Sequence, residues 1–204
     1  MKRRLTAALI TAAALTAALT ACGTAPSTPS TETTPAAGTN VAANTGEHNE
    51  NDIMFLQMMV NHHEQGVEMA KIAAEKSTSD QLKTLAAAVV ATQTDEVATM
   101  KSWLTAWGKA DSADTDVNLH ADHGGLPATS SEEIDSLRST SGADFDPTFL
   151  ALFTGHQHNA VEMSKTEAAE GVNPDAKSLA KSIDESRTAQ IQLMLQLSAA
   201  VPAS

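Results

Sequence analysis

The chain has 204 residues, of which 13 are Lys or Arg and 25 are Asp or Glu, so its formal net charge is −12. This acidic balance excludes a nucleic-acid partner, because neutralising phosphates requires clustered Lys and Arg. Hydrophobic residues make up 42% of the chain and aromatics only 3%, which favours closely packed helices over sheets. The single cysteine excludes an intrachain disulfide framework and a multi-cysteine zinc module.

The N-terminus has the pattern of an export signal. Three basic residues precede an apolar stretch, Leu5 to Thr20, that is short for a bilayer span and typical of a signal peptide. It ends in Leu19-Thr20-Ala21-Cys22, which resembles the bacterial lipobox. We therefore expect residues 1–21 to be a lipoprotein signal peptide and Cys22 to carry the lipid. The protein would then be exported and held at the extracytoplasmic face of a membrane; an ordinary secretory signal with an incidental cysteine is the alternative.

Residues 22–46 are small and rich in Ser, Thr and Pro, so they have little apolar surface to bury. Such a segment does not offset its ordering entropy, and we expect a disordered tether. The folded domain is predicted over residues 47–204.

That domain contains one unit written twice with an offset of 94 residues. Residues 52–71 align without gaps to residues 146–165. The identical pairs are Asp52/Asp146, Phe55/Phe149, Leu56/Leu150, His62/His156, Val67/Val161, Glu68/Glu162, Met69/Met163 and Lys71/Lys165. A repeat of this length is a supersecondary unit, and we expect the two copies to bury their apolar faces against each other.

Each copy predicts two helices, over 52–76 and 80–107 in the first and over 146–170 and 174–198 in the second. Asp52 and Asp146 are suitable N-caps, and Gly108 is a suitable stop. The hairpins 52–108 and 146–198 are joined by a crossover, 109–145, with a short helix expected near 132–138. The fold class is therefore all-α, a four-helix bundle built from two duplicated hairpins. The sequence leaves the relative orientation of the hairpins open.

The helix over 52–76 carries a pair of histidines on its apolar face. At about 100° per residue, His62 and His63 point inward with Met59 and Met69. Buried imidazoles need hydrogen bonds or coordination, and imidazole with thioether sulfur suits copper as Cu(I) or Cu(II). The alternative is a hydrogen-bonded core histidine among methionines that fill the core.

The second copy carries fewer of these donors. His156 and Met163 keep the places of His62 and Met69, but Phe153 replaces Met59, Gln157 replaces His63, and His158 should point outward. We therefore expect one asymmetric site or a weaker second one. Three further side chains have an open role. His120 and His123 in the crossover could supply ligands or form a solvated turn, and Gln93 needs a partner for which an imidazole N–H is one candidate.

These motifs resemble the bacterial domain-of-unknown-function 305 family. Its first helix is matched by Phe55-Leu56, Met59, His62-His63 and Met69-Ala70, with Gly66 at the usual Ala position. Its second helix is matched by Gln93, Glu96, Met100 and Trp103-Leu104. The resemblance implies a ferritin-like four-helix bundle, export and a link to copper handling. The copper ligands it implies are Met59, His62, His63, Met69, His156 and Met163. The chain departs from the family at His156-Gln157-His158 and at Arg187, where the repeat expects Gln.

The leading hypothesis is a lipid-anchored protein that binds copper for sequestration or delivery. No catalytic motif is present, so we expect no enzyme activity. One alternative is a metal-free helical interaction or stress module. Another is a ferritin-like oxidoreductase with a di-iron or di-manganese centre, which needs inward carboxylates, whereas Glu64, Glu68 and Glu162 are predicted to project outward. A homo-oligomer and a separate metal-delivery partner are both compatible with the sequence.

Overall fold

The computed structural model describes residues 44–111 and 129–200. Four long helices, α1 (Glu50–Lys76), α2 (Asp80–Ala106), α4 (Phe145–Glu170) and α5 (Pro174–Ala200), are accompanied by the short helices α3 (Ser131–Ser139) and η3 (Gly142–Asp144). These two ranges contain no strand, which confirms the all-α prediction, and each predicted helix agrees with the structure to within two residues. The predicted signal peptide, Cys22, His120 and His123 lie outside the described residues.

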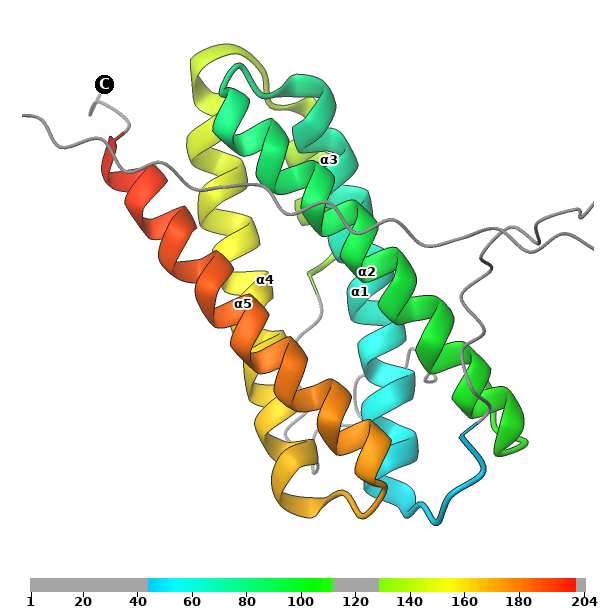
Figure 1. The fold of residues 1–204 in the computed structure, drawn as a ribbon. Helices are drawn as coiled ribbons and strands as arrows, with labels where there is room; N and C mark the ends of the chain where they lie inside the picture. Colours follow the sequence, from blue (N-terminus) through cyan, green and yellow to red (C-terminus); the bar gives the residue numbers. More distant parts are fainter. Residues whose placement is uncertain (1–43, 112–128, 201–204) are drawn as a thin grey trace, which may run out of the picture. The chain divides into compact units, whose positions relative to one another are not determined.

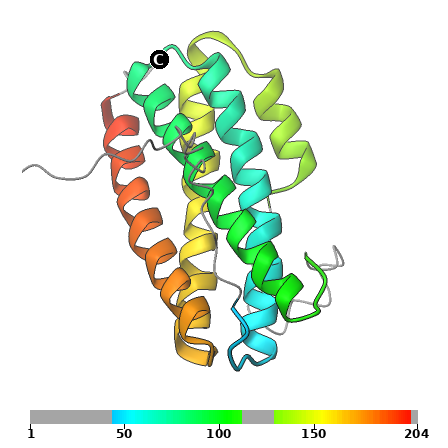
Figure 2. The same cartoon turned by 45° about the vertical axis from the view of Figure 1, so that its right-hand side comes forward.

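The long helices form a bundle of two layers. α1 and α4 pack side by side in one layer, and α2 and α5 lie over them in the other (Figure 1). Asn49 Nδ2 donates to Glu170 O over 3.0 Å at one end, and Lys76 Nζ donates to Thr140 O over 2.9 Å at the other. α1 and α4 are therefore antiparallel. α3 packs on α1 and α4 (Figure 2). Along the described ranges, no helix has the length and apolar character needed to cross a bilayer.

The start of α1 differs from the prediction. Asn49, not Asp52, is the N-cap: its side chain accepts from Asp52 N, and the Asp52 carboxylate accepts from Asn49 N in return. This capping box closes one turn before the predicted start. Asp146 is likewise not a cap, because α4 continues from η3 and begins at Phe145. The N-cap predictions for Asp52 and Asp146 were wrong.

The folded body also begins earlier than the predicted boundary at residue 47. Asn44 is buried, and its side-chain amide exchanges hydrogen bonds with that of Asn173, at 2.8 and 3.2 Å. Trp107 Nε1 donates to Asn44 O over 2.8 Å. Residues 44–46, which were predicted to be part of the disordered tether, therefore belong to the folded body. Trp107 at the end of α2 and Asn173 just before α5 bind Asn44 there.

Candidate metal centre

A band of polar side chains crosses the bundle halfway along its helices, between two apolar clusters. One cluster contains Met69 and the phenylalanines of α4, and the other contains Phe55 and Met59. We call the band between them the polar layer. Its members are His62, His63, Gln93, Glu96, His156, Gln157, Arg187 and Gln190. Each long helix contributes two of these residues, at the positions where its apolar residues change from one cluster to the other.

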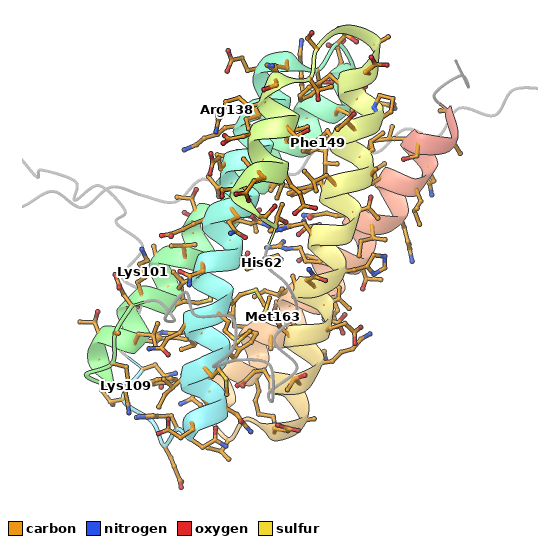
Figure 3. All side chains as sticks on the ribbon, turned by 180° about the vertical axis from the view of Figure 1, so that it is seen from behind. His62, Lys101, Lys109, Arg138, Phe149 and Met163 are labelled. Atoms are coloured by element: carbon orange, nitrogen blue, oxygen red, sulfur yellow. The ribbon has the colours of Figure 1, made fainter. Side chains whose placement is uncertain are left out.

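His62 and His156 meet at the centre of the polar layer. Their rings stack with centroids 3.7 Å apart and an interplanar angle of 13°, and His62 Nε2 lies 2.9 Å from His156 O. His62 is labelled in Figure 3, between α1 and α4. The two residues are equivalent in the repeat, so their contact marks a local two-fold relation between the hairpins. A carbonyl only accepts, so Nε2 of His62 carries the proton. Nδ1 of His62 therefore holds a lone pair, and it has no hydrogen-bond partner.

The two ring nitrogens of His156 have different surroundings. Its Nδ1 lies 2.9 Å from the hydroxyl of Thr129, the residue before the N-cap of α3, and its Nε2 has no hydrogen-bond partner. A Cβ atom on Gly66 would lie 3.0 Å from His156 Nε2 and 2.2 Å from Gln93 Oε1. A side chain at this position would require the Gln93 amide to move. The amide of Gln93 is buried and forms no hydrogen bond, so the imidazole partner predicted for it is not found.

His63 belongs to a charged triad. Its Nε2 lies 2.8 Å from Glu96 Oε2, which also accepts from Arg187 Nη2, and the Arg187 side chain is 0% exposed. A carboxylate only accepts, so Nε2 of His63 carries the proton and Nδ1, which lacks a partner, holds the lone pair. Arg187 and Glu96 compensate each other's charge, as burial of an ion pair requires.

The second copy replaces this triad with a neutral pair. Gln157 Nε2 donates to Gln190 Oε1, and these residues occupy the repeat positions of His63 and Glu96. Arg187 stands at the repeat position of Gln93 and crosses to the first copy. The departures from the repeat at Arg187 and Glu96 are thus coupled, because the arginine of one hairpin neutralises the carboxylate of the other.

The three buried imidazoles are uncharged at neutral pH. Burial lowers the pKa of His156 to about 3, and burial with the neighbouring His156 and His63 lowers the pKa of His62 well below its ordinary value. Burial also lowers the pKa of His63, although Glu96 opposes this effect. Protons therefore do not compete for the unpartnered nitrogens of His62 and His63 near pH 7.

The six predicted ligands do not form one cluster. His62, His63 and His156 are buried together in the polar layer, as predicted, and His158 is exposed. Met69 is two helical turns, about 10 Å, beyond His62 and packs in the cluster with Phe149 and Phe153. Met59 and Met163 lie with the other apolar cluster, the one that contains Phe55. The antiparallel α1–α4 pair causes this division, because residues after His62 approach residues before His156.

Inward carboxylates are present, contrary to the sequence analysis. Glu64, Glu68 and Glu162 are exposed as predicted, but Glu167 and Asp52 are buried and Glu96 reaches the polar layer. The missed signal for Glu96 was its spacing of three residues from Gln93, which puts both on one face of α2. Asp52 accepts from the backbone N–H groups of Val172 and Asn173, so it joins α1 to the α4–α5 turn. Across residues 44–111 and 129–200, no three His, Cys, Asp or Glu side chains are placed to hold one metal ion.

The sequence profile of a family described as a domain of unknown function, DUF305, matches residues 52–198. The chain belongs to the DUF305 family. No curated protein sequence matches it. A DUF305 protein from Streptomyces coelicolor, described as secreted, is 27% identical, with a TM-score of 0.69 over 76% of this chain and 95% of that one. A DUF305 fragment from Deinococcus radiodurans, 21% identical, shares the fold, with a TM-score of 0.66 over 76% of this chain and 99% of the fragment.

A third similar structure holds metal. CopM in its Cu(I)-bound form is 27% identical to this DUF305 protein, with a TM-score of 0.61 over 72% of this chain and 94% of CopM. CopM has also been solved with Cu(II) and with Ag. CopM, whose structure is similar to that of this DUF305 protein, therefore holds copper or silver ions in its metal-bound forms.

Proposed function

We propose that this DUF305 protein binds copper, for sequestration or delivery, through the buried imidazoles of the polar layer. The observation that carries the proposal is the set of three buried imidazole nitrogens without hydrogen-bond partners, His62 Nδ1, His63 Nδ1 and His156 Nε2. A buried polar atom without a partner is costly, and a metal ion that accepts its lone pair removes that cost. The copper-bound forms of CopM support the same ion.

The donors present fit copper better than a harder ion. Imidazole nitrogen and the thioether of Met59, one turn before His62 on α1, are ligands that copper accepts, whereas iron and manganese centres of helical bundles use several carboxylates. Since the described residues hold no group of three His or carboxylate ligands, a di-metal oxidoreductase has no support from the geometry. We propose binding without turnover.

Copper titration of the folded chain tests this function. The wild type should take up Cu(I), with X-ray absorption showing nitrogen ligands. His62→Ala and His156→Gln should weaken uptake by about tenfold or more, and His63→Ala should weaken it too. His158→Ala is the matched control, because His158 lies on the same helix with its ring exposed, and it should bind as the wild type does. A wild type that takes up no more copper than a histidine-free carrier protein overturns the proposal.

The second candidate function is a metal-free interaction module. It is favoured by the absence, among the described residues, of three converging His or carboxylate ligands and by the bonds that His62 and His63 already make within the bundle. In that case the polar layer sets the register of the helices, and His62→Ala would change stability with no copper-dependent difference.

We further propose that the protein works outside the cytoplasm, anchored by lipid on Cys22. The support is the lipobox-like sequence and the secreted relative from Streptomyces coelicolor. Cys22→Ser should move the protein from the membrane fraction to the soluble exported fraction, and mass spectrometry of the wild type should find the acyl mass on residue 22. Unmodified Cys22 in membrane-free wild-type protein would contradict the anchor.

A further inference from the structure

Three methionines gather around a small pocket between α1 and α4. Met54 and Met58 lie one turn apart on α1, and Met163 of α4 completes the wall with Phe55. Met163 is labelled in Figure 3, on α4 beside α1. All three methionines are half-buried, so solvent reaches a pocket that is lined by three thioethers, one ring and four polar residues. A core methionine that only fills space is normally enclosed, as Met59, Met69 and Met100 are.

The size of the pocket restricts its occupant. Its volume is about 40 Å³, which has room for a metal ion or a few water molecules and is too small for a drug-sized organic ligand. The polar lining consists of side chains from Asn51, Thr166, Glu167 and Glu170, none of them basic. The wall therefore presents sulfur and oxygen atoms to the occupant, which suits a cation and disfavours an anion.

We propose that Met54, Met58 and Met163 form a separate binding site for a soft monovalent metal ion, Cu(I) or Ag(I). Thioether sulfur is a soft, uncharged ligand that selects Cu(I) over Zn(II), Mg(II) and other harder ions. The exposed carboxyl group of Glu170 at the same pocket draws a cation toward the sulfurs.

This site does not depend on the histidine centre. Met54 precedes His62 and Met163 follows His156 by about two helical turns, roughly 10–12 Å along each helix, so an ion held by these two sulfurs lies away from the imidazoles. Met58, one turn before His62, is the member of the site nearest to the histidine centre. The partly open methionine site suits exchange of an ion with the surroundings, whereas the imidazoles are enclosed. The protein would then hold soft metal at two places that differ in ligand and in access.

Methyl-labelled methionine gives the test a readout for each sulfur. On titration of the folded chain with Ag(I), a redox-stable substitute for Cu(I), the methyl signals of Met54, Met58 and Met163 should shift together and saturate. Zn(II) should not shift them. The variant Met54→Leu/Met58→Leu/Met163→Leu should lose about one bound Ag(I) per chain, because leucine keeps the volume and removes the sulfur. The control Met100→Leu/Met194→Leu, which replaces buried methionines away from the pocket, should lose none.

The outcomes separate this site from the histidine centre. His62→Ala/His156→Gln should leave the silver-dependent shifts of the three methyl groups in place, even if copper uptake by the imidazoles proves absent. The proposal is overturned if these methyl groups shift no more than those of Met100 and Met194, or if the triple leucine variant binds as much Ag(I) as the wild type.

Discussion

A single arginine connects the charges of the two halves of the polar layer. Arg187 is fully buried, and its guanidinium donates to Glu96, which in turn orients His63. Burial raises the pKa of Glu96, but hydrogen bonds from His63 and the charge of Arg187 outweigh it, so the net pKa is lowered and the carboxylate stays ionised. Removing one member of such a pair leaves the other as an uncompensated charge.

Arg187→Gln should therefore destabilise the protein by about 3 kcal/mol in urea unfolding, because Glu96 loses its counter-charge. The double variant Glu96→Gln/Arg187→Gln should recover part of that loss, since the second copy already holds a neutral Gln157–Gln190 pair at the same level. Additive losses in the double-mutant cycle would show that the two residues are not coupled.

Asp52 and Glu167 are two buried acidic side chains that lie next to each other near the N-terminal end of α1. Burial raises the pKa of Glu167 to about 9, and the neighbouring Asp52 carboxylate adds to the effect. Burial also raises the pKa of Asp52, but hydrogen bonds from the backbone N–H groups of Asn49, Asn173 and Val172, together with the neighbouring protonated Glu167, outweigh burial, and its net pKa is lowered. Glu167 thus keeps its proton at neutral pH beside the ionised Asp52 carboxylate.

Between pH 4.5 and about 9 the folded state holds a proton on Glu167 that the unfolded state releases. The free energy of unfolding should therefore fall as pH rises through this window, by at least about 1 kcal/mol. Glu167→Gln should remove that decline and leave the protein more stable at pH 8, because the neutral amide takes the same place beside Asp52 without a titrating proton. Urea unfolding from pH 5 to 9 measures it, with the exposed Glu162→Gln as the control. An unchanged slope in Glu167→Gln would contradict the assignment.

At the scale of elements, α3 is a short helix packed on α1 and α4, and the residue before its N-cap contacts His156. It has nine residues, and only Ile134 and Leu137 are buried. Its N-terminal end holds Thr129 against His156 Nδ1. Docking of this short helix on α1 and α4 therefore places the hydrogen-bond partner of His156 Nδ1.

Leu137→Ala should release α3 without unfolding the bundle. Losing the burial of the Leu137 side chain costs about 2–4 kcal/mol of stabilisation. A nine-residue helix that keeps one other buried side chain does not offset this cost and should detach. Hydrogen exchange should accelerate in α3 and at residue 129, while α1 and α4 stay protected. Ser136→Ala, on the exposed face, should leave exchange unchanged. Uniform acceleration across all helices would show instead that α3 unfolds only with the whole bundle.

At the scale of the whole molecule, the repeat and the fold are two aspects of one symmetry. His62 contacts its own repeat equivalent, His156, so each hairpin presents the same kind of face to the other. The buried faces of α1 and α4 carry Phe55, Leu56 and Met69 on one side and Phe149 and Leu150 on the other. Neither hairpin can bury this surface alone.

The isolated first hairpin, residues 44–108, should therefore associate with a second copy of itself or stay unfolded. A self-complementary dimer is expected because a two-fold contact accepts an identical partner. Analytical ultracentrifugation with circular dichroism measures both properties. A helical, monomeric hairpin would contradict this account of the core.

The sequence by itself determined the helices, the duplication and the inward direction of His62, His63 and His156, because these follow from local periodicity along one chain. It also pointed to copper through the chemistry of imidazole and thioether. Only the tertiary structure decided that His62 stacks on His156, that Arg187 reaches Glu96, and that Met69 and Met163 lie in different apolar clusters. These contacts depend on how the second hairpin docks on the first. A long crossover leaves that docking free, so the packing of the two apolar faces selects it.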